Sequence, residues 1–433
     1  MKRSLLTSAL VLGISVTAIS SAEKPTMSVL REIIVLPDEV LEPTAVIRTP
    51  DDQMIVTGSS RFHKLGFATK LNYDGKVEWT YRSQQEKHHF YDRADTLDIA
   101  GAVVLENGNV LLCGNDSILD PVTAENGKRR LSSTYGKLIK LDPAGHFIDK
   151  VMIPAVEPST LGIELIDKGV PGRLERGGIK KCGKWGNGIY AIGHMPHIAP
   201  RPSDPTRNTV TNLLWVVRAD MQGRIVWQKF FPVTTVAFDS VGLPQILPNG
   251  DLLIAVTGNN IPFRADQDLH GTEIRVVSPD AKLNAQRNFN TPSPAVGRLN
   301  NSEPILVSQF LYREGITRLV NLNADLSTTQ ERTILGDTTP YNQVPLVRGN
   351  DDLVAFVQTY RDGRYQSFVA RRNLSNGRLE EIPLPQQYSR QTRVADVAAI
   401  KPPGTFVGLR QRTPTAGFEK GGGGLLLTLI HLD

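Results

Sequence analysis

Six of the eight histidines in this chain stand in polar segments between apolar stretches, and arginines accompany them. Arginine binds carboxylates, sulfates and phosphates through charge-assisted hydrogen bonds, and histidine adds a donor that titrates near neutral pH. Side chains of these two types on one surface would bind an anion. The predicted ligand-binding residues are Arg61, His63, His194, His197, Arg201, Arg264 and His270.

Metal ligation is a lower-ranked interpretation of the same histidines. His194 and His197 have the spacing H-x-x-H, but Pro196 lies between them and excludes the helix that would place both rings on one face. The sequence shows no phosphate-binding loop, dinucleotide fingerprint or calcium loop. We therefore expect no metal and no cofactor, and a metal-dependent hydrolase is the last of the alternatives.

The elements that must position these residues come from an internal repeat. Each unit has an apolar strand, a tight polar turn, a second apolar strand ending near glycine, a variable segment, and two more strands joined by another tight turn. Six copies begin near Thr44, Ala100, Gly178, Gly242, Val296 and Val344. Four antiparallel strands per repeat predict an all-β fold, and a β-propeller in particular.

The two ends of the chain predict how such a ring closes. After Asp396 only three more strands follow, whereas LREIIVLP precedes the first copy. A last blade completed by this N-terminal strand would remove the exposed edges of an open sheet. We predict a seven-bladed β-propeller of four-stranded antiparallel blades, with six or eight blades as the nearest alternatives. A β-sandwich followed by a second β domain is the competing architecture.

The connections between the predicted strands differ in length. Short turns such as LENGN and LPNGD join the first strand to the second and the third to the fourth, and pairs such as Asn107-Gly108 and Asn187-Gly188 predict two-residue hairpins. Long polar segments join the second strand to the third and the fourth to the next unit. The predicted ligand-binding residues therefore share one face. An ordinary solvated face is the alternative, because exposed loops are polar in any protein.

A tryptophan motif follows two of the tight turns. It occurs as DGKVEW at 74–79 and as GRIVW at 223–227, whereas the copy at 142–149 keeps the glycine and lacks the tryptophan. This resembles the repeat of the quinoprotein-like (PQQ-like) β-propeller superfamily, in which the tryptophan docks between blades. The adjacent cysteines that accompany the quinone in that family are missing, so the resemblance implies the fold and not the cofactor.

A second, local resemblance covers residues 72–114. The order of a D-G-x-x-x-W strand, a histidine pair and an x-N-G-N hairpin is similar to that of the arylsulfate sulfotransferase propellers. In those enzymes a histidine accepts the sulfuryl group covalently, and further histidines and arginines bind the anion. The resemblance implies His88 and His89 as candidate catalytic residues.

Composition and the N-terminus limit the class of protein. The chain has 49 Lys+Arg and 44 Asp+Glu, a formal net charge of +5, which is too small and too dispersed for a nucleic-acid-binding protein. Residues 1–22 have the basic start, apolar run and small residues of a cleavable secretory signal. No stretch reaches the ~20 apolar residues of a transmembrane helix. We expect a periplasmic or secreted protein with no stable membrane insertion and one propeller domain over residues 23–433.

Two further expectations follow from these residues. Cys113 and Cys182 are the only cysteines, and either one disulfide or two buried thiols fits the sequence. The predicted function is an exported propeller that holds a partner protein or an anionic ligand through its long-loop face. The alternative is an enzyme similar to the arylsulfate sulfotransferases.

Overall fold

The computed structural model of the chain describes only part of its residues. These are residues 27–36, 39, 41–60, 65–83, 98–118, 133–153, 178–201, 204–233, 238–241, 244–258, 272–289, 295–298, 305–311, 316–335, 341–348, 352–361, 364–373, 379–384, 394–400, 405–411 and 424–432. Every regular element within them is a β-strand. In this part of the chain there is no helix with the length and apolar character needed to cross a membrane.

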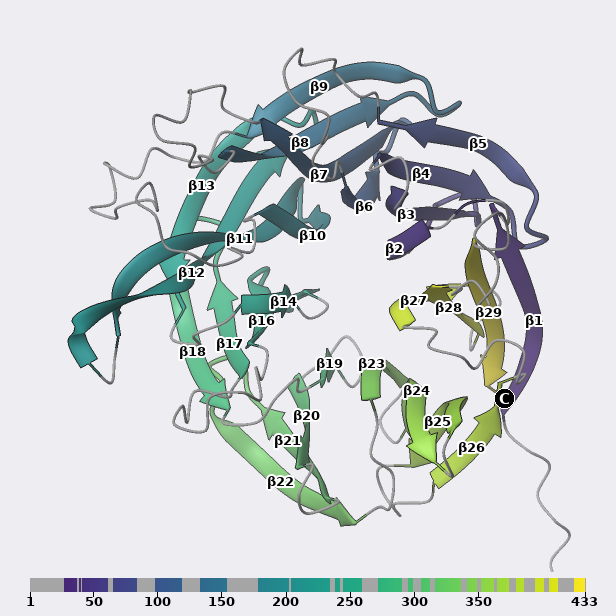
Figure 1. The fold of residues 1–433 in the computed structure, drawn as a ribbon. Helices are drawn as coiled ribbons and strands as arrows, with labels where there is room; N and C mark the ends of the chain where they lie inside the picture. The colour runs from purple at the N-terminus through teal and green to yellow at the C-terminus, as the bar shows by residue number, and fades with distance from the viewer. Residues whose placement is uncertain are drawn as a thin grey trace, which may run out of the picture.

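The strands pair into antiparallel sheets that stand around a common centre (Figure 1). Sheet 1 contains β2 (Leu41–Arg48), β3 (Met54–Ser60), β4 (Gly66–Leu71) and β5 (Val77–Arg82). Sheet 2 contains β6 (Ile99–Val104), β7 (Val110–Ile118), β8 (Ser133–Leu141) and β9 (Phe147–Ile153). Sheet 3 contains β10 (Gly178–Trp185), β11 (Gly188–Arg201), β12 (Asp204–Asp220) and β13 (Ile225–Pro232).

The remaining strands continue the same pattern. Sheet 4 contains β14 (Phe238–Val241), β15 (Gln245–Ile246), β16 (Leu252–Gly258), β17 (Thr272–Val277) and β18 (Leu283–Phe289). Sheet 5 contains β19 (Ala295–Arg298), β20 (Ile305–Leu311), β21 (Ile316–Leu322) and β22 (Thr328–Leu335). Sheet 6 contains β23 (Tyr341–Arg348), β24 (Asp352–Arg361), β25 (Arg364–Asn373) and β26 (Leu379–Pro383).

Sheet 7 combines the two ends of the described chain. It contains β27 (Val394–Ile400), β28 (Thr405–Gln411), β29 (Leu425–Leu432) and β1 (Met27–Val35). The strand β1 pairs antiparallel with β29, from Met27 opposite Leu432 to Val35 opposite Leu425. Glu32 in β1 accepts a hydrogen bond from Arg410 in β28 at 2.8 Å. The predicted all-β, propeller-type architecture of four-stranded antiparallel sheets is confirmed.

The hydrophobic core is divided into clusters between neighbouring sheets. One cluster joins sheet 7 to sheet 1, a second joins sheet 1 to sheet 2, and three more lie at the next junctions up to sheet 5. Both faces of sheets 1 to 4 are therefore covered. This explains why strands such as β3 and β16 are apolar runs rather than alternating patterns.

Most of the tight turns in the described residues share one geometry, which differs from the two-residue hairpins predicted. In the turn at 105–109, Leu105 N–H donates to Asn109 O, and Gly108 N–H donates to Leu105 O. Gly108 takes a positive φ of 79° after the turn, as in a three-residue hairpin loop with a bulge. The prediction at Asn187-Gly188 was displaced by one residue. Trp185 pairs with Gly188 there, and Gly186 has the positive φ.

A β-bulge interrupts the innermost strand near its start. The register shifts between Ile99 and Gly101 in β6 and between Ile179 and Lys181 in β10, and β2, β14 and β27 have similar shifts. The second strand then passes close to the first. A Cβ added at Gly114 would lie 2.1 Å from the backbone oxygen of Asp98. The repeated glycine of the second strand is therefore explained by this close approach.

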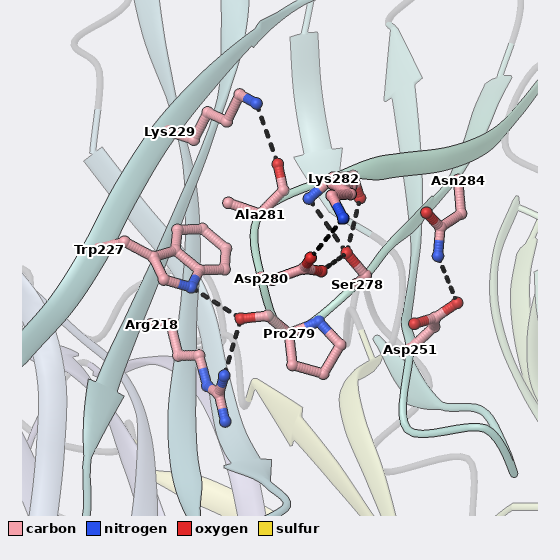
Figure 2. Close-up of polar contacts among 10 residues, drawn as sticks. All are labelled: Arg218, Trp227, Lys229, Asp251, Ser278, Pro279, Asp280, Ala281, Lys282 and Asn284. Atoms are coloured by element: carbon pink, nitrogen blue, oxygen red, sulfur yellow. Dashed lines mark hydrogen bonds and ion pairs between the residues drawn. The ribbon is translucent and has the colours of Figure 1, made fainter.

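Tryptophans of sheets 1 and 3 bind these sheets to the turn of the next sheet. Trp79 of β5 donates its Nε1 hydrogen to Pro143 O at 3.1 Å, and Trp227 of β13 donates to Pro279 O at 2.9 Å. Figure 2 shows that Arg218 donates to the same Pro279 oxygen, and that Lys229 reaches the neighbouring turn carbonyl of Ala281. These contacts hold the sheets at fixed positions in the ring.

Two features of sheet 3 resolve or correct the sequence predictions. Cys113 of β7 and Cys182 of β10 form a disulfide, so sheets 2 and 3 are covalently joined and the free-thiol alternative is excluded. The segment 195–212, predicted as a polar loop, is instead a long ribbon formed by the ends of β11 and β12. Thr and Val residues at 206–211 favour a strand here, and this preference outweighs the loop character of the prolines.

Candidate functional site

The structure describes only three of the predicted site residues. His88, His89, Arg61, His63, Arg264 and His270 lie outside the described residues, and their roles stay predictions. His194, His197 and Arg201 belong to β11, so they lie in a strand rather than in a loop.

His194 occupies a buried position in sheet 3. It pairs with Gly178 of β10 and Leu214 of β12, and it is 1% exposed. It directly follows Gly193, as Asn115 directly follows Gly114 in sheet 2. The two side chains thus stand at equivalent positions of neighbouring repeats, since Gly114 pairs with Ile99 as Gly193 pairs with Ile179.

Asn115 shows what this position does structurally. Its Nδ2 donates to Ile179 O at 2.9 Å and to Asp98 Oδ1 at 3.0 Å, while its Oδ1 accepts from Ile179 N–H at 2.5 Å. An added Cβ at Gly178 would lie 2.6 Å from the same Oδ1. Asn115 therefore fixes the start of β10 against sheet 2, and with it the residues that follow Ile179.

The residues that follow are two adjacent lysines in an innermost strand. Lys180 occupies the bulge of β10, and both Lys180 and Lys181 are half-buried. Burial raises the pKa of Asp98, while the Asn115 hydrogen bond and the charges of Lys180 and Lys137 oppose that rise. Lys137, in β8, is 2% exposed. We define Asp98, Asn115, Lys137 and Lys180 as the junction cluster. It carries more lysines than carboxylates.

Lys181 extends from this cluster to the centre of the ring. Its Nζ donates to Thr44 O in β2 at 3.1 Å, so sheet 3 reaches sheet 1 past the edge of sheet 2. Nearby, Asp396 of β27 accepts from Val46 N–H at 2.9 Å. Burial raises the pKa of Tyr190 in β11, and the charge of Asp396 raises it further. Polar contacts therefore join β10 of sheet 3 to β2 of sheet 1, and β2 to β27 of sheet 7.

Other buried charges in the described residues are paired within the scaffold. Arg275 in β17 binds Glu273 of the same strand and the Pro232 carbonyl of sheet 3. Glu32 binds Arg410 across sheet 7, and burial raises the pKa of Glu32 against the opposing effect of Arg410. These groups join strands and sheets. Only the junction cluster combines several lysines with the ends of the innermost strands among the residues described.

Metal ligands do not gather in this part of the chain. Among the described residues no group of three or more His, Cys, Asp or Glu could hold a metal ion. His146 lies in an exposed turn and contacts Asp142, and His431 contacts Thr405 in sheet 7. Both lie away from the junction cluster along their sheets.

The sequence contained a signal for the lysines that the prediction missed. The run GIKKCG places two charges inside a strand that otherwise packs against its neighbours, and Lys137 interrupts the apolar pattern of β8. A buried lysine has a large desolvation cost, so such positions indicate a structural partner or a ligand. The predicted site residues all stand in the polar segments, so these charges within strands are not among them.

Comparisons with known proteins support the fold and give no family. No protein-family model and no curated protein sequence matches this chain. The solved structure of the polysaccharide lyase Uly1 is similar over 94% of this chain and 100% of its own, with 10% identity and a TM-score of 0.51. Weaker likenesses are those to the Dos1 propeller and to the α-L-arabinofuranosidase Arb93A from Fusarium graminearum.

Those two weaker likenesses are of similar extent. The Dos1 propeller matches at 8% identity and a TM-score of 0.48 over 91% of this chain and 78% of its own. Arb93A matches at 12% identity and a TM-score of 0.48 over 93% of this chain and 98% of its own. At these identities the likenesses concern the fold alone. The sheets around a common centre and the docking contacts between them define the class as a propeller-type all-β protein.

Proposed function

We propose that this chain is an exported seven-bladed β-propeller, closed by its N-terminal strand, that binds an anionic ligand at the face carrying the long segments. The seven sheets in the described residues and the pairing of β1 with β29 support the closed ring. Arg31 of β1 also binds Asp74 in the first turn of sheet 1 at 2.7 Å. A residue of the outer strand of sheet 7 thus contacts the turn of sheet 1, just as Trp79 in the outer strand of sheet 1 contacts the turn of sheet 2.

Two observations support export and the resemblance to the quinoprotein-like superfamily. Disulfides persist in oxidising compartments, so the Cys113–Cys182 bond agrees with a periplasmic or secreted protein. The docking of Trp79 and Trp227 on the turns of the next sheets is the contact expected of that superfamily's motif.

The junction cluster carries the proposal of an anionic ligand. Lys180 and Lys181 are held by a bulged innermost strand whose start is fixed by Asn115, so their backbone is preorganised. Lysines held in place at a partly buried position bind sulfate, phosphate or carboxylate groups more tightly than free surface lysines, because less side-chain entropy is lost. Arg61, His63, Arg264 and His270 would contribute from the long segments of the same face.

Binding of inorganic sulfate and of dextran sulfate, measured by titration calorimetry, tests the proposal. We expect Lys180→Gln to weaken binding about tenfold or more, because one charge-assisted contact is worth about 1.5–3 kcal/mol. Lys184→Gln is the matched control. Lys184 lies in the same strand, exposed at the short-turn end, 4.0 Å from Glu106. Equal losses in the two variants, or no binding by the wild type, would refute the anion site.

A further inference from the structure

The ribbon formed by β11 and β12 extends beyond the rest of sheet 3. β10 pairs with β11 only up to His194, and β13 pairs with β12 only from Leu213 onward. Residues 195–201 and 204–212 therefore pair only with each other among the described residues, and Figure 1 shows the ribbon projecting outside the ring. An isolated two-stranded ribbon is marginally stable in water. A further strand or surface beside this ribbon would stabilise it.

The two edges of the ribbon are not equivalent. Pro196 and Pro200 lie in β11, opposite Asn212 and Asn208 of β12. Because proline has no N–H, it fits this antiparallel ladder only at positions where the main-chain groups point away from the partner strand. Positions 196, 198 and 200 therefore form the outer edge of β11. Two of their three N–H donors are missing, which blocks the addition of another strand.

The outer edge of β12 has a complete set of donors and acceptors. The residues of β12 that pair with positions 200, 198 and 196 are Asn208, Val210 and Asn212. Their N–H and C=O groups therefore also point away from the partner strand. Further along the same edge, Leu214 pairs with Phe231 of β13. In the described part of the chain no strand pairs with 208–212. This edge is where β13 would continue if it were longer.

The sequence of this edge identifies its occupant. Residues 208–212 read Asn-Thr-Val-Thr-Asn, which is the same in both directions about Val210. Antiparallel pairing of two copies about a two-fold axis at Val210 places each residue opposite a residue of its own type and brings no charges together. Threonine and valine also favour strands. We propose that two copies of this protein associate by antiparallel pairing of the β12 edge at 208–212, forming one sheet across the two ribbons.

A cysteine cross-link tests this register directly. Residues that face each other in a hydrogen-bonded antiparallel pair have Cα atoms about 5.5 Å apart, within the range that a disulfide spans. We expect Val210→Cys to give a covalent dimer on a non-reducing gel after mild oxidation. Ile198→Cys is the matched control, because Ile198 lies opposite Val210 on the blocked edge. Absence of the Val210→Cys dimer, or equal dimer from both variants, would overturn the proposal.

Sedimentation velocity provides a second measurement that does not depend on oxidation. The wild type should show a concentration-dependent dimer. Val210→Pro should abolish the dimer by removing the central N–H donor of the β12 edge. Ile198→Pro should leave the dimer intact, because it acts at an outward position of the other edge of the same ribbon. The thermal midpoints of the two variants check that both are folded. A monomeric wild type, or a dimer that persists in Val210→Pro, would contradict pairing at this edge.

Discussion

Asp98 is the residue whose charge is most in conflict with its surroundings in the junction cluster. Burial raises its pKa, against the opposing effects of the Asn115 hydrogen bond, a backbone hydrogen bond and the charges of Lys180 and Lys137. An acid whose folded pKa is raised stabilises the folded state below its unfolded pKa, about 3.9, and loses that contribution as the pH rises through the folded value. At neutral pH the ionised carboxylate is therefore a cost.

Asp98→Asn should accordingly stabilise the protein at neutral pH. The amide oxygen can still accept from Asn115, so the contact that fixes β10 is kept. The difference in unfolding free energy between variant and wild type should be largest near pH 7 and shrink towards pH 4, as denaturant titrations at several pH values would show. The same variant should bind sulfate more tightly. A variant less stable than the wild type at pH 7 would contradict this account of Asp98.

Residue-scale prediction from the sequence was least successful at this cluster. The predicted site residues stand in polar segments, whereas Lys137, Lys180 and Lys181 stand within strands and are brought together only by the contact of sheets 2 and 3. His194 is the case in between. His194 is a predicted ligand-binding residue, but its burial could not be predicted, because the prolines of the segment disfavour the strand pairing that buries it. Histidines 88 and 89 remain predicted catalytic residues, for which release of a phenol from an aryl sulfate is the assay.

At the scale of elements, the turn–tryptophan contact determines how neighbouring sheets fit. Gly145 has a positive φ of 86°, and an added Cβ there would lie 2.6 Å from the Trp79 ring. Gly250 has the same φ, but nothing lies within 4 Å of its added Cβ. Alanine at Gly250 would therefore cost only the strained backbone conformation, whereas alanine at Gly145 would also displace the Trp79 ring.

Alanine at the two positions should give different losses of stability. Gly250→Ala should cost about 1–2 kcal/mol, the price of a left-handed conformation for a residue with a Cβ. Gly145→Ala should cost about 1–3 kcal/mol more, because overpacking against Trp79 adds to it. Chemical denaturation of both variants measures the difference. Equal losses would show that Trp79 does not dock on this turn in solution.

Elements were the most predictable level of this protein. The tight turns and apolar runs located six repeats, and sheets 1–6 begin close to the predicted positions. The loop lengths of most turns, and the ribbon, were predicted wrongly for local reasons. An Asn-Gly pair favours a positive φ without fixing how many residues the loop contains, and a proline is compatible with a strand whose outer edge is unpaired.

At the scale of the whole molecule, β1 connects the two ends of the chain. Its pairing with β29, the buried contact of Glu32 with Arg410 and the bond from Arg31 to Asp74 all join residues that are distant in sequence. Counting strands in the sequence predicted this pairing, because the last repeat lacked one strand. The long segments could not be predicted in the same way, since they have no repeat.

Ring closure is the claim on which the placement of every site residue depends, and residue-resolved hydrogen exchange tests it. The amides of β1 that bond to β29 should exchange as slowly as those of β29. Glu32→Ala removes a partner of Arg410, and it should increase the exchange rates of both sets of amides together. Exchange of the β1 amides at the rate of a free chain terminus, with β29 still protected, would contradict a ring closed by the N-terminal strand.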